Sequence, residues 1–133
     1  ENGDIISLIG CSASGSLMLN AFVDRKDVVH KVINLDGFLR PGTAKGFRSF
    51  EKRGAKSLAF RQSVLRFENM ESELTFEDRK RILTVRPLFD ELVPPETVVI
   101  EGALNKQIPM VEHVLSIATA LMLYDPVIMF LKS

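Results

Sequence analysis

The hydrophobic positions at the start of the chain form two apolar runs, which are separated by a short stretch of small residues. The first run, residues 5–9, contains four aliphatic side chains and predicts a strand that is buried on both faces. The small residues at 10–15 suit a sharp turn in which bulky side chains would clash, and the run over 17–23 predicts a helix. The opening pattern is therefore strand, sharp turn, helix.

The segments that follow complete a βαβ unit. Residues 28–35, VVHKVINL, are rich in β-branched side chains and predict a second strand, which Asp36 and Gly37 end with a turn signal. Because two strands joined through a helix must run parallel, we expect a mainly parallel sheet and the α/β class. His30 falls near the beginning of the second strand, far from the sharp turn, and is expected to be a surface residue.

Residues 38–81 interrupt the strand pattern and predict a helical insertion. An amphipathic helix is predicted over 57–70, and Thr75 is expected to cap a shorter helix. Six of the nine phenylalanines fall in this insertion, enough to line an apolar cleft, which favours a lid over a substrate site. The alternative is that these rings form only a small core of the insertion itself.

The remaining segments predict two more strands and a closing helix. The strands are expected at 81–85 and 97–101, and the second leads into a polar loop over 105–109. The closing helix is expected over 114–131, restarted at Asp125-Pro126. The whole chain, 1–133, is thus predicted to be a single domain, with about four strands flanked by helices.

Composition supports a globular protein and argues against several kinds of partner. With 46% hydrophobic and 26% charged residues among 133, the chain is too apolar for a disordered protein. The net charge is zero, so no overall field attracts nucleic acid or an anionic membrane. Residues 40–66 are basic, but the acidic stretch after them can neutralise their charge. The most apolar segment, 114–124, is about half as long as a membrane span. We expect neither a nucleic-acid nor a membrane partner.

The single cysteine, Cys11, excludes an internal disulfide. Together with the lack of a recognisable signal peptide, this suggests a cytoplasmic protein. Cys11 is expected to be a small buried filler rather than a reactive thiol. No cluster of cysteines and histidines has the spacing of a zinc site, so neither a metal nor an organic cofactor is expected.

The sharp turn places Ser12 at its apex, where the hydroxyl is pushed out of the backbone at the top of a sheet. There it can reach a base, and the N–H of Ala13 can stabilise an oxyanion at the start of the helix. The residues GCSAS at 10–14 resemble the G-x-S-x-G nucleophile elbow of the α/β-hydrolase family, with Ser14 in place of the last glycine. A purely structural turn or a phosphate-binding turn is the alternative.

A serine nucleophile needs a neutral histidine that is itself oriented by a carboxylate. Asp90 follows the third predicted strand and His113 precedes the last helix, so the order Ser12, Asp90, His113 is the order of that family. Residues 87–96, PLFDELVPPE, resemble its acid segment G-x-x-D-x-x-V-P-P-E in all but the first position. Two alternatives stay open: Asp36 as the acid, and Asn105 in the base position, which would make the protein inactive.

The resemblance implies a serine hydrolase that acts on carboxylic esters or related acyl compounds through an acyl-enzyme, without a cofactor. In the family about four strands precede the elbow, whereas here only residues 1–3 do. We therefore expect a partial α/β-hydrolase fold whose first strand has an open edge, which would pair with a second copy or with a missing N-terminal segment. The alternative function is an inactive half-hydrolase module that self-associates through this edge.

Overall fold

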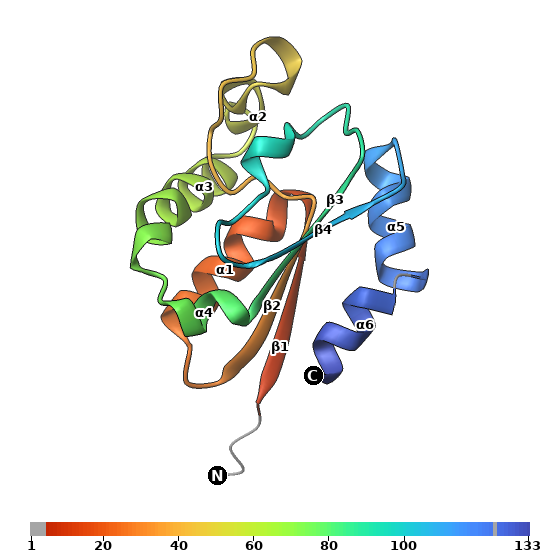
Figure 1. Cartoon of the computed structure of the whole chain (residues 1–133). Helices are drawn as coiled ribbons and strands as arrows, with labels where there is room; N and C mark the ends of the chain where they lie inside the picture. Colours follow the sequence, from red (N-terminus) through yellow and green to blue (C-terminus); the bar gives the residue numbers. More distant parts are fainter. Residues whose placement is uncertain (1–4, 124) are drawn as a thin grey trace.

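The computed structural model describes residues 5–123 and 125–133. Its strands are β1 (Ile6–Cys11), β2 (Val29–Leu35), β3 (Ile82–Pro87) and β4 (Leu104–Ile108), and its helices are α1 (Gly15–Asp24), α2 (Phe50–Gly54), α3 (Leu58–Met70), α4 (Phe76–Lys80), α5 (His113–Leu123) and α6 (Asp125–Lys132). The strands pair in the order β1-β2-β3-β4, and every pair is parallel. The predicted α/β class is confirmed, and all four strands end at the same edge of the sheet (Figure 1).

The sheet is the middle of three layers, with α1, α3 and α4 on one face and α5 and α6 on the other (Figure 1). Successive residues of a strand point to opposite faces, and β2 feeds both cores in this way. Val32 packs with Phe22 of α1, whereas Ile33 belongs to the cluster that contains Ala120 and Phe130. Burial on both sides fixes the position of β2 between the two helical layers.

The prediction that the first strand is buried on both faces is wrong. Ile5, Ile6 and Ile9 are 70%, 47% and 36% exposed. On one face Leu8 packs against the core around α1. The opposite core is built from residues of β2, β3, β4, α5 and α6, and β1 contributes the partly buried Cys11 at its end. The apolar side chains of β1 on that face therefore have little cover, and β1 forms an open edge in the described part of the sheet.

The prediction of a strand over 97–101 is also wrong. Pro95–Thr97 form a short 3-10 helix, and β4 lies in the segment that the sequence predicts to be a polar loop. Val98 and Ile100 are buried as parts of two hydrophobic clusters, so their apolar character reflects packing rather than strand pairing. Since β4 is an edge strand with mostly exposed side chains, it lacks the apolar run that identifies a buried strand.

The helical insertion packs against the rest of the domain through aromatic side chains. The predicted helix over 57–70 matches α3, whose N-cap Ser57 accepts a hydrogen bond from the Phe60 N–H. The ring of Phe38 meets that of Phe60 edge to face at 6.0 Å, and Phe50 and Val64 complete a buried cluster with residues of the loop after β3. The insertion therefore shares a core with the segment after β3, and its movement as a lid stays a prediction.

A buried lysine fastens the C-terminal helix to the sheet. Lys31 of β2 donates hydrogen bonds from Nζ to the Phe130 carbonyl oxygen at 2.6 Å and to Ser133 Oγ at 2.7 Å. These two neutral oxygens accept hydrogen bonds from the buried ammonium group and hold the end of α6, which begins at Asp125 as predicted. No single described helix is long and apolar enough to cross a membrane; α5 and α6 meet that test only as a pair bent by 49°.

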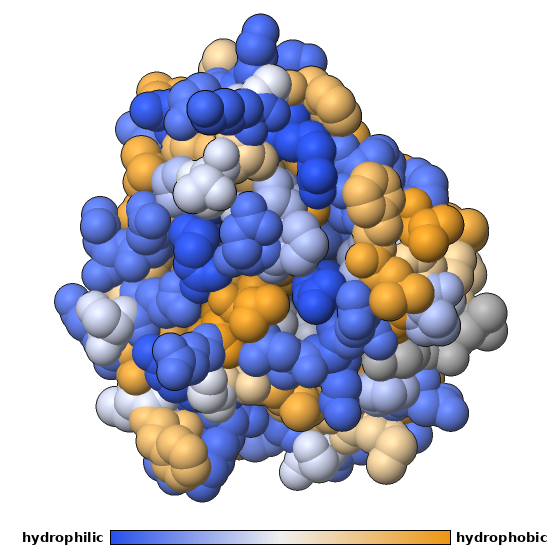
Figure 2. Space-filling model, turned by 45° about the horizontal axis from the view of Figure 1, so that its top comes forward, coloured by the Kyte–Doolittle hydropathy of each residue, from blue (hydrophilic) through white to orange (hydrophobic). Residues whose placement is uncertain are grey.

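The surface near the carboxyl ends of the strands is turned toward the viewer in Figure 2. Hydrophilic side chains cover most of this face, and apolar side chains gather in smaller patches between them. The chemistry that the sequence predicts belongs to this end of the sheet, since the loops after β1, β2, β3 and β4 all start there.

Candidate active site

The turn between β1 and α1 has the strained backbone of a nucleophile elbow. Ser12 has φ of 52°, a left-handed conformation that residues other than glycine adopt rarely. Ser14 closes the turn, because its Oγ accepts from the Cys11 N–H at 2.8 Å and donates to the Cys11 carbonyl oxygen at 2.8 Å. The residue that departs from the G-x-S-x-G pattern thus contributes two hydrogen bonds to it, which the pattern alone does not reveal.

Two glycines allow the close approaches that the turn requires. A Cβ atom on Gly10 would lie 2.7 Å from the Ser14 carbonyl oxygen. A Cβ atom on Gly15 would lie 2.0 Å from Oδ1 of Asn34, which belongs to β2. The close helix-to-strand contact therefore occurs at Gly15, one position after the last glycine of the pattern, and this explains why Ser14 is accommodated.

The three residues predicted for the chemistry lie together at the carboxyl ends of the strands. His113, the first residue of α5, has Nε2 2.8 Å from Ser12 Oγ and Nδ1 2.5 Å from Asp90 Oδ2. The other oxygen of Asp90 accepts from the N–H groups of Leu92 and Val93, at 2.5 and 2.7 Å. When the imidazole is neutral, this arrangement favours the hydrogen on Nδ1, facing the carboxylate, and Nε2 is then free to accept the proton of Ser12.

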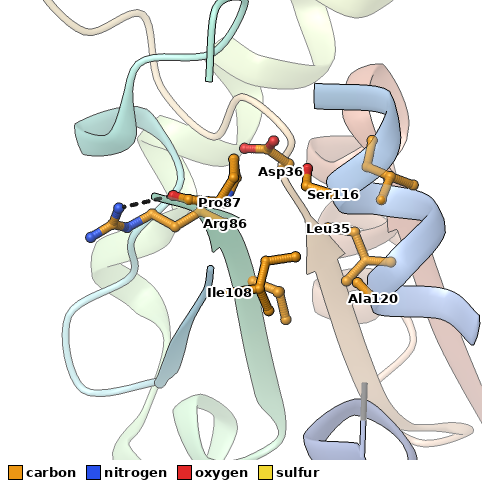
Figure 3. A pocket seen from close by; sticks show the side chains of 9 residues that line it. Leu35, Asp36, Arg86, Pro87, Ile108, Ser116 and Ala120 are labelled. Carbon is orange, nitrogen blue, oxygen red and sulfur yellow. Dashed lines mark hydrogen bonds between the residues drawn. The ribbon is translucent and has the colours of Figure 1, made fainter. Parts of the chain in front are cut away.

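Asp36, the alternative acid, reaches the same histidine nitrogen. Its Oδ2 lies 3.1 Å from Nδ1 of His113, and its Oδ1 is buried without a hydrogen-bond partner. Its φ of 56° makes Asp36 and Ser12 the two described non-glycine residues with positive φ. In Figure 3 Asp36 lies at the end of β2 near Ser116 of α5, above a narrow gap with no room for a water molecule. Both candidate acids therefore meet at His113.

The buried cluster of two carboxyls and one imidazole shifts all three pKa values. Burial raises the pKa of Asp36 to about 7, and the Asp90 carboxylate adds to this shift. Burial alone would raise the pKa of Asp90, but hydrogen bonds from His113, Asp36 and the loop N–H groups hold it well below its usual range. Burial alone would lower the pKa of His113, but the two carboxylates outweigh it and raise the value to about 10. Near neutral pH Asp90 is charged, and the other two groups compete for a proton.

The same cluster offers the ligand atoms for a metal ion. Among residues 5–123 and 125–133, Asp36, Asp90 and His113 form the one group of such side chains whose ligand atoms lie within 4.8 Å of one another. A metal on Nδ1 would displace its hydrogen and leave the remaining ring proton on Nε2, facing Ser12. The separations of 2.5 and 3.1 Å are those of hydrogen bonds, so the cluster fits acid-base chemistry better than metal binding.

A cavity of about 230 Å³ opens beside the elbow. Its wall contains Ser12 and Ala13, the rings of Phe38 and Phe60, Leu92, Val93, Ser57 and two basic residues, Arg53 and Lys56. Ala13 is exposed, at the position where the sequence predicts an oxyanion donor. The cavity provides room for a small molecule next to the Ser12 hydroxyl, between apolar rings and cationic side chains.

Three further residues considered from the sequence lie outside this cluster. Asn105 does not occupy the base position, because its side chain is bonded to Thr84 and to the backbone of Ile100. Cys11 is half-buried, and burial raises the pKa of its thiol, as a filler role predicts. His30 is exposed near the start of β2, as predicted.

Comparison with known proteins reveals similarity of structure but not of sequence. No family model matches the sequence, and no curated protein matches it. A metagenome-derived lipolytic enzyme has a similar structure, with a TM-score of 0.59 and 15% identity over 98% of this chain and 66% of that one. A hydrolase from Oleispira antarctica is also similar, with a TM-score of 0.62 and 15% identity over 98% of this chain and 66% of that one.

A peroxisomal α/β-hydrolase from Saccharomyces cerevisiae is similar as well, with a TM-score of 0.56 and 12% identity over 92% of this chain and 52% of that protein. The chain therefore spans between about half and two thirds of the length of these structures. At such low identities the similarity establishes a shared fold, and the expected partial fold is confirmed.

Proposed function

We propose that this chain, which has part of the α/β-hydrolase fold, is a serine hydrolase that cleaves carboxylic esters or related acyl compounds. The observation that carries the proposal is a continuous hydrogen-bonded path from Ser12 Oγ through both nitrogens of His113 to Asp90, with separations of 2.8 and 2.5 Å. A path of this kind couples a weak nucleophile to a base and orients that base, which is the requirement for acyl transfer at a serine.

In the first step Ser12 Oγ attacks the carbonyl carbon of the substrate, and Nε2 of His113 takes the hydroxyl proton. A carbon–oxygen bond forms while the carbonyl electron pair moves onto oxygen, where the N–H of Ala13 and the start of α1 stabilise the negative charge. Asp90 retains the hydrogen bond from Nδ1 and stabilises the imidazolium that His113 becomes.

In the second step the oxyanion re-forms the carbonyl, the bond to the alcohol breaks, and His113 returns its proton to the departing oxygen. The acyl group is then attached to Ser12. A water molecule attacks the acyl-enzyme with His113 again acting as the base, and the acid is released while Ser12 regains its proton. Ester and water are thereby converted into acid and alcohol.

Labelling with a fluorophosphonate probe tests this proposal, because the probe forms a covalent bond with an activated serine. Wild type should be labelled, whereas Ser12→Ala and His113→Ala should not. Ser72→Ala and His30→Ala serve as matched controls, since both residues are exposed and lie outside the site, and these variants should be labelled like wild type. Labelling that persists in Ser12→Ala, or a folded wild type that is never labelled, would contradict the proposal.

The second candidate function is an inactive module that binds a second copy of itself through β1. The exposed aliphatic side chains of this edge strand favour it, because an uncovered apolar edge readily pairs with another strand. This function requires no activated serine, so a chain that associates strongly but is never labelled would support it against the hydrolase.

A further inference from the structure

Three cationic side chains lie on and just after α2, and two of them reach the space beside the elbow. Arg53 and Lys56 contribute to the wall of the cavity that contains Ser12. Together with Lys52 they also line an adjoining cavity of about 240 Å³. The two cavities share Arg53 and Lys56, so these cations lie at the boundary between them. We call the second cavity, which is lined by Phe47, Lys52, Arg53 and Lys56, the basic arm.

The cations of the basic arm have no acidic partner within the described chain. Other cations of the same segment are paired, Arg40 with Glu71 and Arg66 with Asp24. The ion pairs between described residues include neither Lys52 nor Arg53 nor Lys56.

One nitrogen of the arm is also without a hydrogen bond. Nε of Arg53 is buried and has no partner among the described atoms. A buried charged donor without an acceptor costs free energy, and a nearby anion would lower that cost. The two terminal nitrogens of the planar guanidinium present a pair of N–H groups that matches the two oxygens of a carboxylate.

The space beside Ser12 has a second, uncharged arm. A cavity of about 260 Å³ adjoins the central one and shares Ala13, Ser57 and Phe60 with it, and no basic or acidic side chain lines it. An ester extends in two directions from its carbonyl carbon, so one arm can receive the acyl part and the other the alcohol part. The central cavity of about 230 Å³ is smaller than most ligand sites, which favours a short chain.

We propose that the substrate is an ester of a short dicarboxylic acid, whose free carboxylate is bound by Arg53 and Lys56 while Ser12 attacks the ester carbonyl. This inference rests on the proposed function of Ser12 and names the class of substrate for that site. Hydrolysis then gives the dicarboxylate and an alcohol, with the carboxylate held in the basic arm and the alcohol leaving through the uncharged arm.

A pair of esters of the same shape tests the charge preference. Monomethyl glutarate carries the carboxylate, and methyl 4-carbamoylbutanoate carries an uncharged amide in its place. Wild type should have a kcat/KM about ten- to a hundredfold higher for the charged ester, as expected for hydrogen bonds to a charged group. Arg53→Met and Lys56→Met should each reduce this ratio about tenfold.

Lys45→Gln is the matched control, because Lys45 is an exposed cation of the same segment and lines neither cavity. This variant should keep the wild-type ratio. Lys56 is itself exposed, so its substitution leaves the fold intact even where Arg53→Met perturbs it. A wild-type ratio near one, or a ratio that neither Arg53→Met nor Lys56→Met changes, would overturn the inference.

Binding to the Ser12→Ala variant separates this inference from the proposed function. Glutarate should shift the backbone NMR signals around Arg53 and Lys56, glutaramide should not, and the added change Lys56→Met should weaken glutarate binding about tenfold. If these results are obtained while neither ester is cleaved, the hydrolase proposal fails and the carboxylate site stands. The absence of any shift with glutarate, or tighter binding of inorganic phosphate than of glutarate, would overturn the carboxylate site.

Discussion

At the scale of single residues, two carboxylates compete for one hydrogen on Nδ1 of His113. Asp90 lies closer, at 2.5 Å against 3.1 Å for Asp36, and its second oxygen is fixed by the N–H groups of the loop after β3. The second oxygen of Asp36 has no partner. In the proposed mechanism Asp90 is therefore the acid that orients the imidazole, and we expect Asp36 to act as a reserve carboxyl that changes the proton affinity of His113.

The variant Asp36→Asn should shift the pH dependence of activity toward lower pH. The carboxylates raise the pKa of His113, and only the neutral imidazole can accept a proton from Ser12. Removing one carboxylate lowers that pKa, so the acidic limb of the kcat/KM profile should move down by about 1–2 pH units. The profile is measured between weakly acidic and alkaline pH, with the exposed Asp27→Asn as control. An unmoved limb would argue that Asp36 does not influence His113.

Substituting the acids singly and together should reveal the reserve role. Asp90→Asn should lower kcat by only about 10- to 100-fold, because Asp36 can still accept the hydrogen of Nδ1, whereas the double variant should lose about 10⁴-fold. The measurement is a double-mutant cycle on kcat with a small ester. Losses of the two single variants that simply multiply would show that the acids act independently.

At the scale of elements, the sequence predicts helices and strands that are buried in the core, but it does not predict the strands at the edges of the sheet correctly. The sequence predicts β2 because both of its faces are buried, and it predicts α3 because Ser57 caps an amphipathic run. It misplaces β4, whose side chains are mostly exposed, and it assigns burial to β1, whose apolar residues lack a neighbouring layer on one side. The spacing of apolar residues predicts which side chains tend to be buried, but it does not predict which strand or helix will cover them.

The same contrast applies to the site. Ser12 and Asp90 could be named because each lies in a local pattern after an expected strand, and His113 because it directly precedes the last expected helix. The joint contact of Asp36 and Asp90 with one nitrogen depends on how two loops meet, which no local pattern records. The basic arm was equally hidden, since charged runs usually form solvated faces and only the fold brings Arg53 next to the elbow.

The variant Ser14→Ala should weaken the elbow. It removes the two hydrogen bonds that join Ser14 Oγ to the backbone of Cys11, and we expect the free energy of unfolding to fall by about 1–2 kcal/mol. Urea unfolding measures this loss, with Ser72→Ala as an exposed serine control. Gly15→Ala should cost more, because its Cβ would enter the space of Asn34. A Ser14→Ala variant as stable as wild type would contradict the role given to this residue.

At the scale of the whole molecule, the open edge of β1 is the feature that we expect to drive association. Parallel pairing with β2 leaves the other side of β1 unpaired in the described chain, and Ile6 and Ile9 are partly exposed. Wild type should therefore self-associate with rising concentration in sedimentation velocity experiments. A lysine on an edge strand opposes pairing, so Ile6→Lys should shift the chain toward the monomer.

Leu58→Lys provides the comparison for this experiment, since Leu58 is an exposed apolar residue at the start of α3, away from the edge. Its association should equal that of wild type. A wild type that sediments as a monomer at every concentration would exclude self-association through β1 and would also remove the support for the second candidate function.

The hydrogen bonds of Ser12 and Lys31 both join distant parts of the sequence, and this affects the order in which the protein folds. Ser12 lies 101 positions before its hydrogen-bond partner His113. Lys31 lies 102 positions before its hydrogen-bond partner Ser133. Bringing such distant segments together costs loop-closure entropy, which only the finished domain repays. In the proposed mechanism Ser12 stays inert until these segments meet, so the appearance of probe labelling during refolding should mark the moment at which α5 and α6 dock.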